Sequence, residues 1–381
     1  MRRFKSGLRK PSSGTALLAC PGKKSKAEER GRPAQKRVSR IPKKAAPSSA
    51  AERSPSMIRV LLVPPFRPEH VSRFADLEGF SFRFADRPDD PAVSEAEIIL
   101  GRPSEALLGR AASLRWLQLP FAGSNDYARL PAFAGGRISL TNLSGAFGQS
   151  ISEVVLGYVL ALYKHLHLYR DHQARREWVD EGWQDSPVGK RVLILGTGNI
   201  GCETARLLSV FTGDIVGLRR DPRAVPPFFR RVVGPEELDR ELPEADIAVG
   251  ALPESPETHW MLNRGRLFRM KKTALVINVG RGGLIDSNAL ADALREGRIA
   301  GAALDVTDPE PLPGDHPLWG CPNLILTPHI SGGSFGHLKA TEERLFDICR
   351  ANLIRFRAGE PLLNRVDPET GYRVSENRYE G

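Results

Sequence analysis

The sequence has few cysteines and no long apolar run, and each absence narrows the class of protein. Among 381 residues there are four cysteines, which lie far apart and form no Cys-x-x-Cys pair. We therefore expect neither a zinc site nor a disulfide framework, we expect no other metal, and a reducing cytoplasm is the predicted location. The longest apolar run, near 154–162, is far shorter than the roughly 20 residues of a membrane span. The apolar stretch at 15–20 is also too short for a signal-peptide core, which needs about 7–15 residues.

Acidic residues are scarce at the N-terminal end of the chain. The whole sequence has 55 Lys and Arg against 45 Asp and Glu, a formal net charge of +10. Residues 1–56 hold 16 of the basic and 3 of the acidic side chains, a net of +13, so the remaining 325 residues carry a net charge of −3. The basic pI therefore belongs to one segment, and it gives little reason to expect a nucleic-acid partner for the rest of the chain.

The same segment, 1–56, lacks apolar periodicity and is rich in Lys, Arg, Pro, Ser and Ala, a composition that predicts disorder. Three interpretations are open: a tail that binds nucleic acid or an anionic surface, an organelle transit peptide, or a gene start placed too early. The third is favoured because Met57 directly precedes the apolar stretch 58–63, which has the pattern of a buried first strand.

Short apolar segments alternate with helix-length segments through the rest of the chain, and the length fits about two domains. A first series of predicted strands covers 58–63, 97–100, 116–119 and 138–141. Apolar residues at helical spacing over 153–178 then predict a long helix. A second series covers 191–195, 214–218, 247–250, 274–279, 300–306 and 324–327. Because strands that alternate with helices form parallel sheets, the sequence predicts an α/β protein with two parallel-sheet lobes.

A glycine motif follows the first strand of the second series. It lies between the apolar run 192–195 and a predicted helix at 203–210. In this setting glycines allow a tight turn and let a pyrophosphate approach the backbone at the positive end of the helix. The sequence therefore predicts a dinucleotide site on six consecutive residues: Gly196, Thr197, Gly198, Asn199, Ile200 and Gly201.

The end of the next strand indicates which dinucleotide binds. An acidic residue at this place would bind the ribose 2′-hydroxyl of NAD, but the chain has Arg219 followed by Arg220. Two guanidinium groups match a 2′-phosphate, so NADP is the preferred cofactor. NAD stays open as an alternative, because the nearby Asp221 could accept a hydrogen bond from a ribose hydroxyl if the loop shifts.

Three residues with complementary chemistry follow later strands of the second series: Arg281, Glu310 and His329. Open α/β sheets bind ligands at the carboxyl ends of their strands, so we expect these side chains to share one site. They suit the reduction of a 2-keto acid. Arg281 would hold the substrate carboxylate and polarise the carbonyl. His329 would protonate the carbonyl oxygen, and Glu310 would orient the imidazole and favour its charged form.

With these motifs in this order, residues from about 58 to 372 resemble the D-isomer-specific 2-hydroxyacid dehydrogenases, and the nearest branch is the glyoxylate/hydroxypyruvate reductases. The family's catalytic residues correspond to Arg281, Glu310 and His329. The chain departs from the usual pattern at Phe121, at 253–254 and at 330–334, and these departures bear on the substrate rather than on the reaction class. The matching segments are the glycine motif and 251–258, 263–270, 278–283, 304–312, 316–329 and 363–368.

The resemblance also implies a domain plan. A Rossmann nucleotide-binding domain at 158–332 would be inserted into a flavodoxin-like substrate domain at 57–157, to which residues 333–381 return as a helix at 336–357 and a tail. Members of the family are similar in forming homodimers, and the helix from 153 with its arm through Trp178 and Trp183 is the expected contact. Further contacts follow from the same resemblance. For the cofactor they are Ala251, Leu252, Val279 and Asp305, and for the substrate carboxylate they are Ala122, Gly123 and Ser124.

Two functions from different classes are therefore considered. The first is the NAD(P)H-dependent reduction of a small 2-keto acid, with neither a membrane nor a nucleic-acid partner. The alternative is a non-enzymatic protein on the same scaffold, similar to the dehydrogenase-like corepressors, that would use the basic tail. The complete set of Arg281, Glu310 and His329 beside a dinucleotide turn favours the enzyme.

Overall fold

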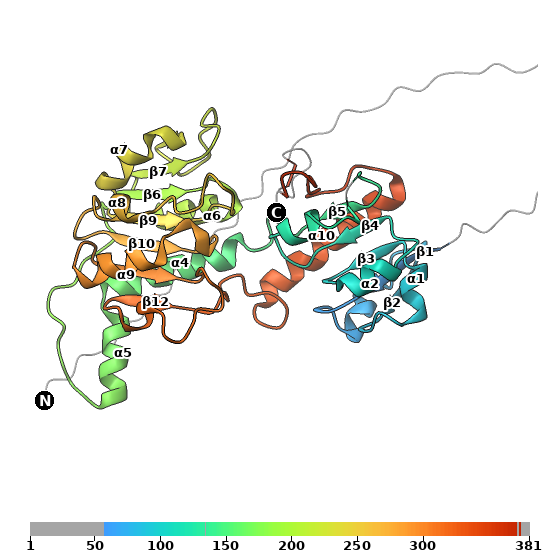
Figure 1. Cartoon of the computed structure of the whole chain (residues 1–381), viewed down its shortest axis with the longest axis horizontal. Coiled ribbons are helices and arrows are strands. Elements are labelled where there is room, and N and C mark those ends of the chain that lie inside the picture. Colours follow the sequence, from blue (N-terminus) through green and yellow to red (C-terminus); the bar gives the residue numbers. More distant parts are fainter. Residues whose placement is uncertain (1–56, 134, 372, 375–381) are drawn as a thin grey trace, which may run out of the picture. The chain divides into compact units, whose positions relative to one another are not determined.

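The computed structural model describes residues 57–133, 135–371 and 373–374 (Figure 1). The predicted basic extension at 1–56 and the end of the predicted tail, 375–381, lie outside the described residues. The described strands form two sheets, and every strand runs parallel to its neighbours. The prediction of an α/β protein with two parallel sheets is confirmed.

The first sheet has the order β2-β1-β3-β4-β5, which is the flavodoxin-like order. Successive side chains of its strands point to opposite faces. Leu61 belongs to the core shared with α1 (Pro91–Glu95) and α2 (Glu105–Arg110), whereas Leu62 belongs to the core shared with α10 (Lys339–Ala358). The sheet is therefore covered on both faces. Its strands are β1 (Ile58–Leu62), β2 (Phe80–Phe84), β3 (Ile98–Leu100), β4 (Trp116–Gln118) and β5 (Ser139–Thr141).

The second sheet has the order β12-β11-β10-β9-β6-β7-β8, so the chain reverses its direction across the sheet between β6 and β9. Ile194 packs in the core that includes α4 and α6, and Leu195 packs in the opposite core with α8 and α9. Sheets of this kind bind ligands at the carboxyl ends of the strands where the order reverses, which here are β6 and β9. The strands are β6 (Val192–Leu195), β7 (Ile215–Leu218), β8 (Arg231–Val233), β9 (Ile247–Gly250), β10 (Leu275–Asn278), β11 (Gly301–Leu304) and β12 (Leu324–Leu326), and the helices are α4 (Gly148–Tyr163), α6 (Asn199–Leu208), α8 (Arg264–Leu267) and α9 (Ser287–Arg295).

After the second sheet the chain returns to the first sheet through α10. Asn352 of this helix is fully buried, and its Nδ2 donates to Gln118 Oε1 of β4 at 3.0 Å. Its Oδ1 accepts from the N–H of Leu363 at 2.7 Å. Residues far apart in the sequence thus complete one core, as expected for an inserted domain. The boundaries at 157 and 332 stay a prediction.

Three expectations about individual elements were wrong. The sequence missed β2 and β8, which are edge strands with partly exposed residues and therefore a weak apolar pattern. The long helix predicted over 153–178 is two helices, α4 and α5 (Leu166–Arg175), because His165 adopts φ 53° and interrupts the helical backbone. The C-terminal helix predicted from 336 begins at Lys339.

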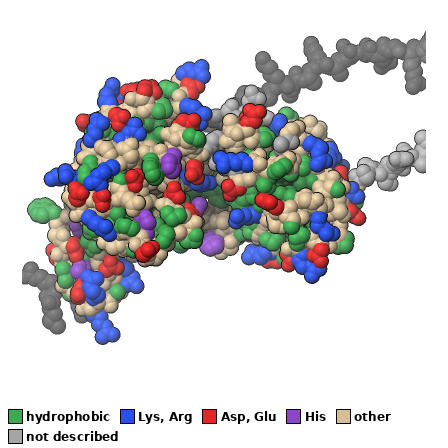
Figure 2. All heavy atoms as spheres, viewed as in Figure 1, with side chains coloured by type: hydrophobic (Ala, Val, Ile, Leu, Met, Phe, Trp, Pro, Cys, Tyr) green, Lys and Arg blue, Asp and Glu red, His purple; other side chains and the backbone are tan. Residues whose placement is uncertain are grey.

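Charged side chains of both signs are interspersed over the face of the described residues shown in Figure 2. This mixture agrees with the small net charge of the sequence after residue 56. Within the described part of the chain, no helix is both long enough and apolar enough to cross a membrane.

Candidate active site

The glycine motif forms the turn between β6 and α6. Gly196 adopts φ 109°, and a Cβ there would lie 2.8 Å from the Ala251 oxygen. A Cβ at Gly201 would lie 1.9 Å from the Gly196 oxygen, so only glycine allows the helix to begin this close to the strand. Gly198 caps α6, and a Cβ there would meet nothing within 4 Å. The turn therefore offers open backbone at the positive end of a helix, which fits a pyrophosphate.

Loops from neighbouring strands lie around this turn. A Cβ at Gly280, after β10, would lie 2.6 Å from the Leu252 oxygen, after β9. Thr197 packs over β7, where a Cβ at Gly217 would lie 2.4 Å from the threonine methyl group. These contacts bring the loops to one edge of the sheet, at the reversal between β6 and β9. The predicted cofactor residues on these loops and on the first turn of α6 are Thr197, Asn199, Ile200, Ala251, Leu252 and Val279.

Arg219 and Arg220 follow β7 at the same edge. The Arg219 N–H donates to the Val233 oxygen at 3.0 Å, which fixes the backbone of this loop. Asp221 is engaged by Arg223, whose Nε donates to Oδ1 at 2.8 Å and whose Nη2 donates to Oδ2 at 2.5 Å. These hydrogen bonds lower the pKa of Asp221 to about 2. The loop therefore presents two arginines beside a carboxylate that is already paired, which suits a 2′-phosphate better than a ribose hydroxyl.

Arg281 follows β10 and lies against the loop after β4. A Cβ at Gly123 would lie 2.2 Å from Nη2 of Arg281, so the guanidinium is in close contact with this glycine. Asn278 fixes the turn, because its Nδ2 donates to the Arg281 oxygen at 2.9 Å and its Oδ1 accepts from the Gly280 N–H at 3.1 Å. Two groups that were predicted to bind the substrate carboxylate are thus brought together.

Hydrogen bonds from side chains fix the loop after β4. Asn142 Nδ2 donates to the Ala122 oxygen at 2.8 Å. The hydroxyl of Ser124 is buried and donates to the Gly371 oxygen at 2.8 Å, so this side chain supports the loop. The N–H groups of Ala122 and Gly123 have no acceptor among the residues that the structure describes. They are therefore available to a carboxylate.

His329 and Glu310 form a hydrogen-bonded pair at the ends of β12 and β11. Nδ1 of His329 lies 2.6 Å from Oε1 of Glu310. The two side chains are 47% and 41% exposed, so the pair faces open space rather than the core. Because Nδ1 faces the carboxylate, we assign Nε2 as the ring nitrogen that can exchange a proton with a substrate.

Asp305 was predicted as a cofactor contact, and in the structure both oxygens of its carboxylate accept hydrogen bonds from the segment that carries His329. Oδ1 accepts from Thr327 Oγ1 at 2.6 Å and from the Ile330 N–H at 2.9 Å. Oδ2 accepts from the Ser331 N–H at 3.0 Å and from the Ser331 hydroxyl. Asp305 is 1% exposed, so this carboxylate is a buried anchor. These partners of Asp305 were not predicted from the sequence. Thr327 and Ser331, two positions before and after His329, were a sequence feature that could have indicated them.

Known proteins are similar to this chain in both sequence and structure. The family model for the NAD binding domain of the D-isomer specific 2-hydroxyacid dehydrogenases matches residues 156–331. A glyoxylate/hydroxypyruvate reductase B from Pectobacterium carotovorum is 31% identical over 294 residues, which cover 74% of this chain and 88% of that protein. A solved family member from Aeromonas salmonicida is 36% identical, with a TM-score of 0.72, and covers 83% of this chain and 100% of its own.

A second solved structure is a D-isomer specific 2-hydroxyacid dehydrogenase from Xanthobacter autotrophicus in complex with NADPH. It is 28% identical with a TM-score of 0.70, and the alignment covers 83% of this chain and 100% of that one. Both structural matches therefore extend well beyond the nucleotide-binding part. The chain belongs to the D-isomer specific 2-hydroxyacid dehydrogenase family, whose members are oxidoreductases that act on CH–OH groups with a nicotinamide cofactor.

Proposed function

We propose that this chain reduces glyoxylate, hydroxypyruvate or a similarly small 2-keto acid to the 2-hydroxy acid, with NADPH preferred over NADH. One observation carries the proposal. Arg281, after β10, contacts Gly123, while His329 and Glu310 form a pair in the loops that follow β12 and β11, the next two strands along the sheet. An anchor for a carboxylate and a donor for a proton therefore stand on one edge of the sheet. This arrangement favours the enzyme over the non-enzymatic alternative.

The reaction follows from the groups at this edge. Arg281 and the N–H groups of Ala122 and Gly123 would bind the substrate carboxylate, and the guanidinium would polarise the adjacent carbonyl. Bound NADPH supplies the hydride. His329, as imidazolium, would donate its Nε2 proton to the carbonyl oxygen, and neutral His329 would take the proton back in the reverse reaction. Glu310 would hold the ring in this orientation through its hydrogen bond to Nδ1.

The cofactor would be held by two groups of contacts. The backbone of the turn from Gly196 to Gly201 would bind the pyrophosphate, and Arg219 with Arg220 would bind the 2′-phosphate. The pairing of Asp221 with Arg223 supports this preference for NADPH. A carboxylate whose two oxygens already accept hydrogen bonds from an arginine is not free to bind the ribose hydroxyls of NADH.

We also place the enzyme in the cytoplasm as a homodimer. Trp178 and Trp183, in the arm that follows α5, are 104% and 97% exposed. Aromatic side chains of this size are normally covered, and a second copy of the chain is the partner that the family plan provides.

The cytoplasmic assignment rests on the absence of a pairing pattern among the cysteines of the sequence.

Steady-state oxidation of NADPH and NADH tests the proposed activity. We expect turnover with glyoxylate and hydroxypyruvate, slower turnover with a larger 2-keto acid, and a higher kcat/KM with NADPH. The absence of turnover with all three acids would contradict the proposal, and a higher kcat/KM with NADH would contradict the cofactor preference alone.

A further inference from the structure

A chain of hydroxyl groups connects α4 to the segment 327–333. Tyr158 Oη is hydrogen-bonded to Thr327 Oγ1, which donates to Asp305 Oδ1 at 2.6 Å. A carboxylate only accepts, and the threonine hydroxyl has one proton, so the proton between Tyr158 and Thr327 comes from Tyr158. Burial raises the pKa of Tyr158 to about 12, and the phenol therefore keeps this proton at neutral pH. The hydrogen bonds thus run in one direction, from the helix to the carboxylate.

A second hydroxyl of α4 holds the other side of the same segment. Ser150 is buried, and its Oγ donates to the Ser331 oxygen at 2.7 Å. A Cβ at Gly333, where φ is 57°, would lie 2.9 Å from Ser150 Oγ. A Cβ at Gly332 would lie 3.3 Å from the ring of Phe147. The two glycines therefore let the segment lie directly on α4.

His329 lies between these two anchors. Its backbone adopts φ 54°, a left-handed conformation that a residue with a side chain rarely adopts. Its ring is half exposed, so packing does not fix the direction of the imidazole. That direction depends on the backbone, which is anchored at Thr327 and at Ser331, and on the hydrogen bond to Glu310.

We infer that Tyr158 and Ser150 are positioning residues, through which α4 sets the direction of the His329 imidazole. Neither residue has a place among the proposed contacts with substrate or cofactor. They act by holding Thr327 and Ser331, which flank the histidine. The inference rests on the proposed function, because it takes His329 as the proton donor.

The variant Tyr158→Phe tests the inference because it removes one hydroxyl and keeps the ring. A misdirected imidazole should lower kcat with glyoxylate by about 10- to 100-fold. The solvent deuterium isotope effect on kcat should increase, since proton transfer becomes slower relative to the other steps. The KM for NADPH should stay unchanged, because the pyrophosphate turn is intact.

Tyr163→Phe is the matched control. Tyr163 lies on the same helix and is equally buried, but its hydroxyl has no hydrogen-bond partner among the described residues. It should keep the wild-type kcat and isotope effect. An equal loss in both variants would overturn the inference, because general destabilisation of α4 would then explain the result.

Hydrogen–deuterium exchange of residues 327–333 gives a readout that does not depend on turnover. Exchange should be faster in Tyr158→Phe and in Thr327→Val, and it should stay near wild type in Tyr163→Phe and in Thr327→Ser, which retains the hydroxyl. Wild-type exchange and wild-type kcat in Tyr158→Phe would overturn the inference. A wild-type chain that turns over no 2-keto acid would contradict the proposed function instead, and the exchange rates would still decide whether α4 holds the segment.

Discussion

Asp221 and Arg223 show how a single ion pair bears on the choice of cofactor. From the sequence, Asp221 was the residue that could bind the ribose if the cofactor were NAD. In the structure both of its carboxylate oxygens accept hydrogen bonds from Arg223. Both partners are largely exposed, so the pair adds little to stability. Its consequence is local: it occupies the carboxylate that would otherwise attract a ribose and repel a 2′-phosphate.

The cofactor assignment predicts the outcome of two substitutions. Arg219→Asp should lower kcat/KM for NADPH by about 10- to 100-fold, because a charge-assisted hydrogen bond is worth about 1.5–3 kcal/mol. Arg223→Ala should raise kcat/KM for NADH, because it releases Asp221. The measurement is the ratio of kcat/KM with the two cofactors.

Arg298→Ala is the control for the second substitution. Arg298 also pairs with an acidic residue two positions earlier, Glu296, on the surface. An NADPH preference that is unchanged in Arg219→Asp would refute the phosphate role of the arginine. A gain for NADH that is as large in Arg298→Ala as in Arg223→Ala would refute the role of the Asp221 pair.

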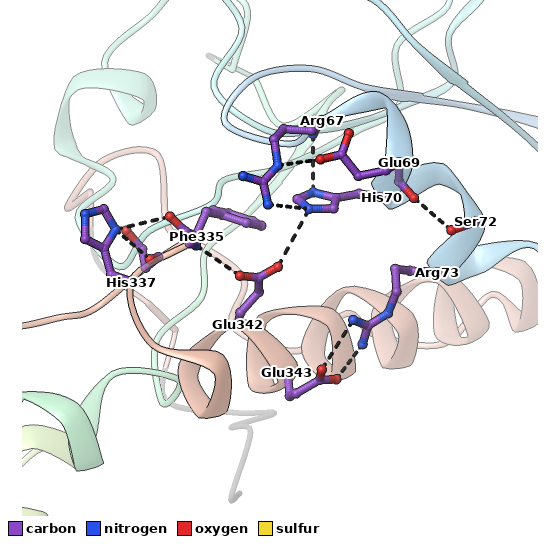
Figure 3. A network of polar contacts seen from close by, with 11 residues as sticks. Arg67, Glu69, His70, Ser72, Arg73, Phe335, His337, Glu342 and Glu343 are labelled. Atoms are coloured by element: carbon purple, nitrogen blue, oxygen red, sulfur yellow. Dashed lines mark hydrogen bonds and ion pairs between the residues drawn. The ribbon is translucent and has the colours of Figure 1, made fainter.

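Among the secondary-structure elements, the 3-10 helix η1 (Pro68–Phe74) is tied to α10 by a buried histidine (Figure 3). Nδ1 of His70 accepts from the Arg67 N–H at 3.3 Å, and Nε2 lies 3.7 Å from Glu342 Oε1. The second oxygen of Glu342 accepts from the Gly336 N–H at 3.0 Å. The network therefore links η1, the start of α10 and the segment before it.

This histidine predicts a pH dependence of stability. Burial lowers the pKa of His70, and the neighbouring Arg67 lowers it further, whereas Glu342 and Glu69 raise it and Arg73 lowers it. The folded chain therefore binds fewer protons than the unfolded chain just below the ordinary histidine pKa of about 6.5. The free energy of unfolding should fall as the pH decreases through this range.

His70→Asn isolates that contribution, because an amide oxygen can replace Nδ1 as an acceptor but does not titrate. The measurement is the free energy of unfolding by urea at pH 7.5 and 5.5. We expect a smaller decrease between the two pH values in His70→Asn than in the wild type. An equal decrease in both proteins would refute the role of this histidine.

The elements differed in how well the sequence predicted them. Strands such as β6, with four buried apolar residues, give a clear pattern in the sequence. The residues that follow such strands could therefore be assigned to one edge of the sheet from the sequence alone. Edge strands such as β2, which has one buried residue among five, give a weaker apolar pattern. The break at His165 and the hydroxyl contacts of Tyr158 and Ser150 depend on which elements pack together, and no local pattern encodes them.

For the whole molecule, the proposed dimer makes the exposed arm after α5 an interface. Replacing Trp178 and Trp183 by serine should shift the equilibrium from dimer to monomer, since burying an aromatic side chain contributes about 1.5–3 kcal/mol. Light scattering after size-exclusion chromatography at micromolar concentration measures this shift. Trp319→Ser is the control, because Trp319 is also exposed but lies outside the arm. A wild-type chain that is monomeric under these conditions would contradict the dimer.

Glyoxylate-dependent oxidation of NADPH by the wild-type chain and by His329→Ala is the most direct test of a reductase that takes its proton from this imidazole. We predict turnover in the wild type and a loss of about 10²–10⁴-fold in kcat in the variant. NADPH should bind equally well to both, since the pyrophosphate turn and the arginines after β7 are unchanged. A wild-type rate in His329→Ala, or no turnover by the wild type, would contradict the assignment.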